Sequence, residues 1–196
     1  MLLLGAHRAG WGAGELGLAR GQLRRGAMVG LVAAGVVVVV VAIGVLLADR
    51  VPLLAGLLAD ERAVASSDRL LYEVVLRIPL GTALFEEVLF RGVLFAGWVR
   101  AAGERAAGER AAMIGSSVVF GLWHVAPTAV ALEVNGVAVG SAMGVLGIIG
   151  GVVVTTIAGL LFAWLRRVSG SLVAPILAHT ATNVAGLLAA ASVVKG

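Results

Sequence analysis

The 196-residue chain contains no cysteine, and only 13% of its residues are charged. The lack of cysteine excludes disulfide bonds, thiolate metal sites and cysteine nucleophiles together. A soluble domain has about a quarter of its residues charged, whereas this chain is 60% hydrophobic, with a mean hydropathy of +1.05. Only four prolines accompany 28 glycines, which suits closely packed membrane helices. The net charge of +4 comes without a long basic run, so nucleic acid is not an expected partner.

Long apolar segments predict an all-α, multi-pass transmembrane bundle of about five to seven membrane helices. The expected spans are roughly residues 27–48, 70–99, 111–126, 138–165 and 172–194. Pro79 is expected to kink or break the second span, and Pro127 to end the third. Residues 51–59 suggest a short interfacial helix, and residues 128–165 have room for one more short helix. The tandem repeat AAGERAAGER, within residues 100–110, is expected to be a solvated connector.

The first 26 residues do not resemble a signal peptide, because His7, Arg8 and Glu15 interrupt a short apolar stretch. We expect an interfacial or partly disordered cytoplasmic segment there. With the N-terminus inside, nine arginines fall on inner segments and only four basic residues on outer ones. The inner set is Arg8, Arg20, Arg24, Arg25, Arg100, Arg105, Arg110, Arg166 and Arg167, and the outer set is Arg50, Arg62, Arg69 and Lys195.

A short set of polar residues lies inside the predicted spans, where polar groups are costly and mark functional sites. They are Glu73, Arg77, Glu86, Glu87, Arg91, His124, His179 and Asn183. Three pairs have a spacing of four residues, which places each pair on one helix face: Glu87 with Arg91, Phe120 with His124, and His179 with Asn183. Glu86 is about 100° round the helix from Glu87 and is expected to face elsewhere.

Each of these features also has a purely structural explanation. Glu87 and Arg91 can form a structural ion pair, and a lone histidine can bond a carbonyl. For Glu73 and Arg77, near the outer end, the structural or snorkelling interpretation is preferred. The remaining polar set, at similar depths on three helices, favours one shared site.

The residue types limit the chemistry of that site. A glutamate and a histidine can activate water as a general base, and a histidine with an asparagine can stabilise an oxyanion. Glu86, His124 and His179 are alternatively candidate ligands for a divalent metal such as zinc. No HExxH motif, no GxSxG motif and no aspartate inside a span is present. A water-activating glutamate site, with or without a metal, is therefore predicted.

The motifs EEVLFR, FGLWH and GSLVAPILAHTATN resemble those of the CAAX-protease and bacteriocin-processing (CPBP, or Abi-type) intramembrane endopeptidases. The resemblance covers roughly residues 68–194. It implies that Glu86 is the general base, that His124 helps to hold the water, and that His179 and Asn183 form the oxyanion hole. Glu87 and Arg91 would organise the site, and Phe120 would pack beneath it or line the substrate path.

Three chain regions are therefore expected: the N-terminal segment 1–26 and a first membrane helix with an interfacial helix at 27–67, both from the apolar pattern, and a catalytic membrane domain at 68–196, from the resemblance. Expected partners are membrane lipid and a protein or peptide substrate, prenylated or membrane-embedded. Composition suggests a bacterial plasma membrane. The alternatives are a non-catalytic immunity or scaffolding protein of the same fold, and a proton-coupled transporter.

Overall fold

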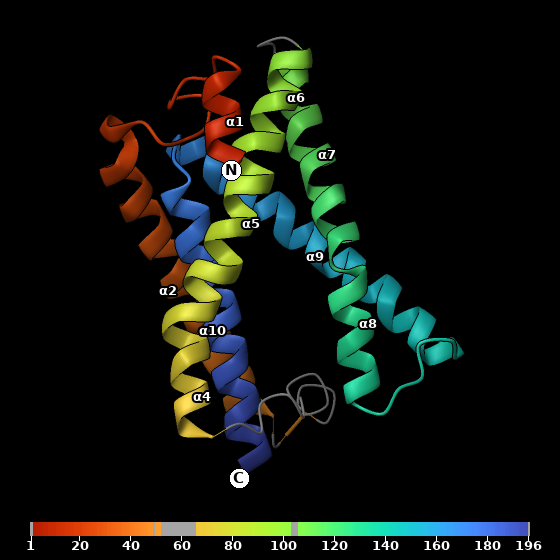
Figure 1. Ribbon diagram of the computed structural model, residues 1–196. Helices are drawn as coiled ribbons and strands as arrows, with labels where there is room; N and C mark the ends of the chain where they lie inside the picture. Colours follow the sequence, from red (N-terminus) through yellow and green to blue (C-terminus); the bar gives the residue numbers. More distant parts are fainter. Residues whose placement is uncertain (1, 49, 52–65, 103–105, 196) are drawn as a thin grey trace.

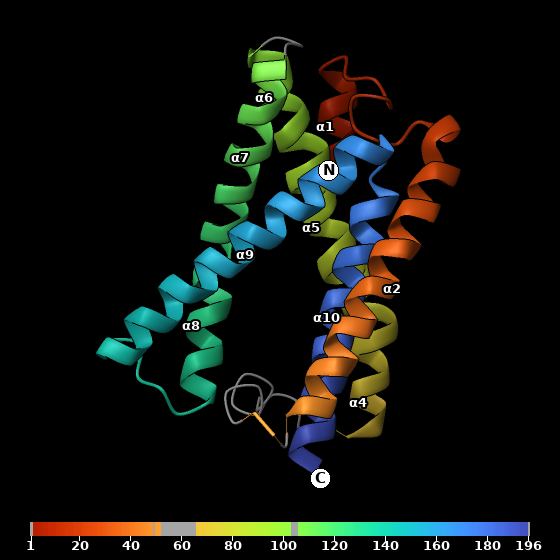
Figure 2. The ribbon, with the colours of Figure 1, turned by 180° about the vertical axis from the view of Figure 1, so that it is seen from behind.

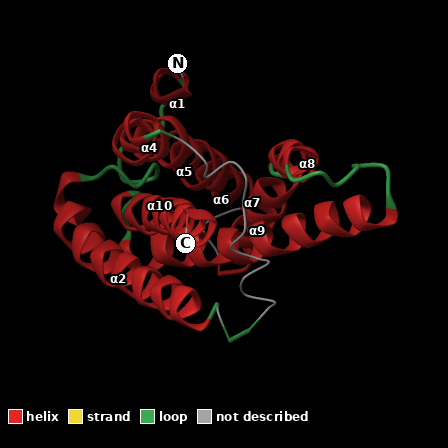
Figure 3. Cartoon of the chain, turned by 90° about the horizontal axis from the view of Figure 1, so that it is seen from below, coloured by secondary structure: helices red, strands yellow, loops and turns green. Residues whose placement is uncertain are grey.

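The computed structural model describes residues 2–48, 50–51, 66–102 and 106–195, and within them the chain is helical without any strand (Figure 3). The N-terminal part contains α1 (Leu2–Arg8), η1 (Arg20–Gln22) and the long helix α2 (Leu23–Leu47). The C-terminal half contains α7 (Ala106–Trp123), α8 (Val125–Val134), α9 (Ala142–Ser169) and α10 (Val173–Lys195). The predicted interfacial helix lies almost wholly outside the described residues.

Four helical stretches in the described part are long and apolar enough to cross a membrane: Arg20–Leu47, Ala107–Val134, Ala142–Ser169 and Val173–Ser192. Their exposed apolar side chains suit contact with lipid, where a backbone must satisfy its own hydrogen bonds. This confirms the predicted multi-pass helical bundle. The tandem repeat is helical on both sides of residues 103–105, since one helix runs to Ala102 and the next begins at Ala106.

A fifth helical segment, residues 67–102, contains most of the buried charged side chains, and we call it the charged helix. It consists of α4 (Ser67–Tyr72), η3 (Glu73–Leu84), α5 (Phe85–Glu87), η4 (Val88–Leu94) and α6 (Phe95–Ala102). The two η segments are π-helical, and η3 contains Pro79. Pro79 was predicted to kink or break this span, and the chain stays helical past it, in the wider turns of the π-helical segment η3.

The third span breaks at His124, three residues before the predicted end at Pro127. α7 ends at Trp123, His124 has a non-helical backbone (φ −83°, ψ 0°), and α8 starts at Val125. Pro127 lies in the first turn of α8, where a missing N–H is harmless because no helical acceptor precedes it. The extra short helix allowed for after residue 128 is thus α8, which begins slightly earlier.

Two helix pairs form the body of the bundle: α2 runs along α10, and α7 packs against α9, which crosses it obliquely (Figures 1 and 2). Close approach explains both pairs. A Cβ added to Gly30 on α2 would lie 2.9 Å from Ala174 Cα on α10, and one added to Gly121 on α7 would lie 2.8 Å from the Val152 carbonyl on α9. Glycine permits such contacts between membrane helices. In the view from behind, α9 crosses away from α10 towards α8 (Figure 2).

The N-terminal segment packs against the helices of the bundle where it is described. Leu16 is buried against Ala6 and Ala96, and the Leu172 N–H donates to the Gly17 carbonyl. Arg166 donates to the carbonyls of Gly14 and Glu15. These contacts hold the segment against the charged helix and the α9–α10 turn, at the end of the bundle where the N-terminus lies (Figure 1).

Candidate active site

Glu86 and Glu87 form the centre of the site, midway along the charged helix in α5. Both carboxylates are buried, with Glu86 8% exposed and Glu87 fully enclosed. Glu86 Oε1 accepts a hydrogen bond of 3.2 Å from Trp123 Nε1. Its other oxygen, Oε2, is buried and has no hydrogen-bond partner among the described residues. Such an oxygen is costly in a folded chain, and because Glu87 Oε2 also has no partner among the described residues, it is the surroundings of Glu86 Oε2 that distinguish it.

Two histidines face that unpaired oxygen. Glu86 Oε2 lies 3.8 Å from His179 Nε2 and 4.0 Å from His124 Nε2. These distances exceed a direct hydrogen bond and are of the size that one bridging water spans. The structure therefore brings together three of the four residues predicted to be catalytic, from the charged helix, the α7–α8 break and α10.

The opposite ring nitrogen of each histidine already has a partner. His124 Nδ1 lies 2.7 Å from the Phe120 carbonyl, and His179 Nδ1 lies 2.8 Å from Glu87 Oε1. A carbonyl or carboxylate oxygen accepts, so both Nδ1 atoms are assigned as N–H donors. Both Nε2 atoms are thereby directed at Glu86, and the orientation of each ring is set by its outer bond.

Glu87 and Arg91 form the predicted pair, and both side chains are fully buried. Arg91 Nη1 donates to Glu87 Oε1 at 3.0 Å, and Arg91 Nη2 donates to the Gly159 carbonyl at 3.0 Å. Glu87 thus links Arg91 to His179. Glu86 has other partners, Trp123 and the two histidines, but the imidazole of His179 lies near both glutamates, with Nδ1 2.8 Å from Glu87 Oε1 and Nε2 3.8 Å from Glu86 Oε2.

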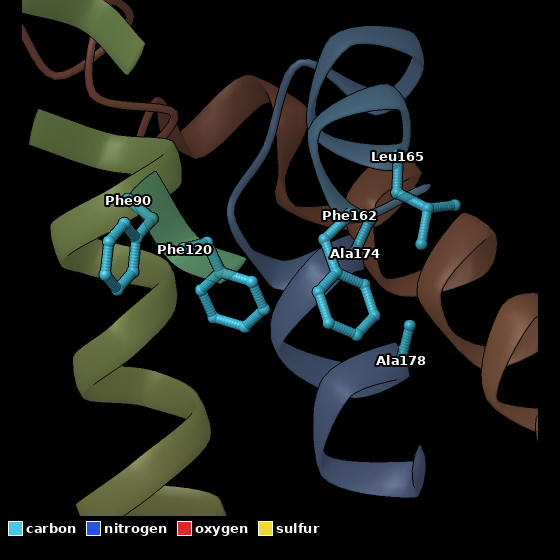
Figure 4. Close-up of a cluster of buried hydrophobic side chains, with 6 residues drawn as sticks. All are labelled: Phe90, Phe120, Phe162, Leu165, Ala174 and Ala178. Carbon is cyan, nitrogen blue, oxygen red and sulfur yellow. The ribbon is translucent and has the colours of Figure 1, made fainter. Parts of the chain in front are cut away.

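Aromatic rings enclose the charged pair, and Figure 4 shows them between the charged helix and α10. The Arg91 guanidinium lies 4.2 Å from the ring centre of Phe120 and 5.3 Å from that of Phe162, within the range of cation–π attraction. Phe162 also stacks on His179, at 4.8 Å between ring centres and 19° between planes. Phe120 therefore packs beneath the polar groups, as one of its two predicted placements required.

Asn183 lies one turn beyond His179 on α10 and is half-buried. In the described part of the chain its amide makes no hydrogen bond to another residue, so the structure does not join it to the Glu86 cluster. Its assignment to an oxyanion hole stays a prediction.

Three contributors were not identified from the sequence: Trp123, Phe162 and Gly159. Trp123 directly precedes His124 in the FGLWH motif, which was a usable signal. Phe162 and Gly159 lie on α9, a span without any charged residue before Arg166, so nothing in its pattern marked them. Their contacts depend on how α9 packs against the charged helix.

The candidate zinc ligands Glu86, His124 and His179 do come together. Among the described residues, however, no group of three or more histidine, cysteine, aspartate or glutamate side chains is arranged to hold a metal ion. The chemistry below is therefore derived from the side chains alone.

A pocket of about 600 Å³ lies at a different place, between the N-terminal segment, α6, α7 and α9. It is lined by Gly14, Glu15, Phe95, Ala96, Val99, Arg100, Glu109, Arg166 and Arg167. Its acids are paired, Glu15 with Arg100 at 3.6 Å and Glu109 with Arg167 at 3.0 Å. We assign the chemistry to the Glu86 cluster, because only there does a buried acceptor face two histidines.

The family model described as "Rce1-like: Type II CAAX prenyl endopeptidase" matches residues 69–185, more than half of the chain, and spans every residue of the cluster. No curated protein and no solved structure matches the chain significantly. Four apolar spans together with this match identify an integral membrane protein. The chain belongs to the Rce1-like family of type II CAAX prenyl endopeptidases.

Proposed function

We propose that the chain is an active intramembrane endopeptidase in which Glu86 activates a water molecule. The observation that carries this proposal is the unpaired, buried Glu86 Oε2, which faces Nε2 of His179 and His124 at 3.8 and 4.0 Å. A carboxylate and the lone pair of a neutral imidazole are both acceptors. A water placed between them supplies the donors that this arrangement of acceptors requires.

In the proposed reaction Glu86 takes a proton from the water while His124 Nε2 accepts its second hydrogen as a hydrogen bond. The water oxygen then attacks the carbonyl carbon of the scissile peptide bond. Collapse of the tetrahedral intermediate breaks the C–N bond, and Glu86 returns the proton to the leaving amine. Atoms and charge balance without a covalent enzyme intermediate.

His179 is proposed to stabilise the oxyanion, which requires a proton on Nε2 in addition to the one on Nδ1. Its contact with Glu87 at 2.8 Å and the stacked ring of Phe162 fix the orientation of the imidazole, so that Nε2 is directed into the site. Asn183 is proposed to donate its side-chain N–H to the same oxygen, from one turn further along α10.

The substrate class is proposed from the family. Type II CAAX prenyl endopeptidases act on prenylated C-terminal sequences, and a lipid-anchored peptide suits a site formed by membrane helices. We propose a prenylated or membrane-embedded protein or peptide as the substrate, in a bacterial plasma membrane. The arginine-rich segments described here gather at one end of the bundle, which supports a cytoplasmic N-terminus (Figure 1).

The test is comparative N- and C-terminal proteomics of membranes from cells that express the wild-type protein or Glu86→Ala. Protein termini found only with the wild type would support proteolysis and name the substrate. Equal termini at equal expression of both proteins would favour a non-catalytic role. A second assay follows hydrolysis of an internally quenched peptide ending in an S-farnesylated CAAX sequence, with the unprenylated peptide as control.

A further inference from the structure

Trp123 is the one polar side-chain contact that Glu86 makes within hydrogen-bond distance in the described part of the chain. Its Nε1 donates to Oε1 of Glu86 at 3.2 Å, whereas Oε2 has no partner and faces the two histidines. The indole N–H can donate but never accept. The two oxygens of one carboxylate are therefore made chemically different by a residue outside the predicted motif positions.

We propose that Trp123 is a positioning residue that selects Oε2 of Glu86 as the basic atom. This inference rests on the proposed function. The terminal torsion of a glutamate is broad and close to two-fold, so a free carboxylate can exchange its two oxygens or rotate out of line. A hydrogen bond to Oε1 opposes that rotation and keeps Oε2 directed at the histidines.

The local structure holds the indole in place from two directions. Trp123 is the last residue of α7, directly before the break at His124, so one backbone feature aims both the indole and the imidazole at Glu86. The ring of Phe90, one turn after Glu86 on the charged helix, meets the indole edge-to-face at 5.9 Å. Trp123 as a residue is 48% exposed. The hydrogen bond to Glu86 is the one polar side-chain contact of its indole among the described residues.

The first experiment measures cleavage by Trp123→Phe, which keeps an aromatic ring and removes the N–H. On the quenched farnesylated peptide, kcat is expected to fall about 10- to 100-fold while KM is unchanged, the effect of losing one hydrogen bond to a charged group. Trp164→Phe is the matched control, because Trp164 is equally exposed at 50% and lies on α9 away from Glu86. Its kcat should stay at the wild-type value.

The second experiment detects the hydrogen bond between Trp123 and Glu86 by NMR and does not depend on enzymatic activity. The chain has four tryptophans, so the ¹H–¹⁵N spectrum of the detergent-solubilised protein contains four indole signals, and Trp123→Phe assigns one of them. In Glu86→Ala that signal should move upfield while the Trp164 signal stays. An unmoved Trp123 signal would overturn the inference whatever the activity of the protein.

The two proposals fail in different ways. Wild-type kcat in Trp123→Phe, together with an inactive Glu86→Gln, would overturn the positioning role and leave the proposed function intact. Full activity of Glu86→Gln would overturn the proposed function, and with it the role of Trp123, even where the indole signal reports the bond. A rise in KM with unchanged kcat would also contradict positioning, because it indicates a substrate contact instead.

Discussion

Glu87 Oε1 lies 2.8 Å from His179 Nδ1, a contact between residues 92 positions apart in the chain. The same oxygen accepts a hydrogen bond from Arg91, so Glu87 already binds two side chains, Arg91 and His179, before any substrate binds. Each glutamate has an Oε2 without a hydrogen-bond partner among the described residues, and that of Glu86 faces Nε2 of His179 and His124. The two adjacent glutamates therefore differ in role because they have different partners. Glu87 is suited to holding the structure and orienting the histidine ring, and Glu86 is suited to proton transfer.

Glu86→Gln is expected to reduce cleavage by about 10²- to 10⁴-fold, because the amide cannot take a proton from water. Turnover of the quenched farnesylated peptide measures this, with thermal unfolding in detergent as a check on folding. Glu73→Gln is the matched control, since Glu73 lies on the same helix, is also 8% exposed, and pairs with Arg77 away from the site. Activity lost equally in both variants would argue against a specific base.

Arg91→Ala is expected to destabilise the protein by about 3–5 kcal/mol, because it leaves the enclosed carboxylate of Glu87 without its cation. Arg77→Ala removes the same kind of i, i+4 pair, but the Arg77 side chain is 58% exposed, and the loss should be about 1 kcal/mol or less. Thermal or denaturant unfolding in one detergent compares the two. Equal losses would mean that the burial of Arg91 contributes nothing.

Gly159→Ala is expected to cost about 1–3 kcal/mol and to lower activity, since the new Cβ would lie 3.1 Å from both Arg91 Nη2 and the backbone of Ser117. Either α7 and α9 separate or Arg91 shifts, and Arg91 holds Glu87. Gly150→Ala on the same helix meets no atom within 4 Å and should behave as wild type. Unfolding and cleavage are measured side by side; an unaffected Gly159→Ala would show that the α7–α9 contact is loose.

The orientation of the chain is testable with single cysteines, because the natural sequence has none. His7→Cys and Ala138→Cys place an exposed thiol near opposite ends of the bundle. A membrane-impermeant maleimide applied to intact cells should label Ala138→Cys and leave His7→Cys unlabelled until the cells are lysed, as the arginine distribution predicts. The reverse labelling would place the N-terminus outside.

Treatment with a chelator tests the metal alternative. We expect cleavage of the farnesylated peptide to persist after dialysis against EDTA and 1,10-phenanthroline, because Glu86, His124 and His179 can supply the base and the donors without an ion. Metal analysis of the purified protein accompanies the assay. Activity that is lost on chelation and restored by zinc would assign the three side chains as ligands instead.

Much of the helical framework follows from local properties of the sequence. A long apolar segment has to be helical in lipid, and residues four apart share a face, so the spans and the Glu87–Arg91 pair were predictable. The same local rules misplaced the helix ends. Pro79 was expected to kink or break the charged helix, and π-helical turns continue the helix past it. The third span breaks at His124 rather than at Pro127.

The sequence by itself determined which helices carry acids, histidines and arginines, because polar groups in apolar segments are few and their spacing is fixed by the helix. Only the tertiary structure decided that both glutamates meet His179, that Trp123 bonds one oxygen of Glu86, and that α9 supplies Phe162 and the Gly159 carbonyl. Those contacts join residues on different helices. They depend on how closely glycine lets the helices approach and on the rotation of one helix relative to another. The residue pattern along a single helix specifies neither of these.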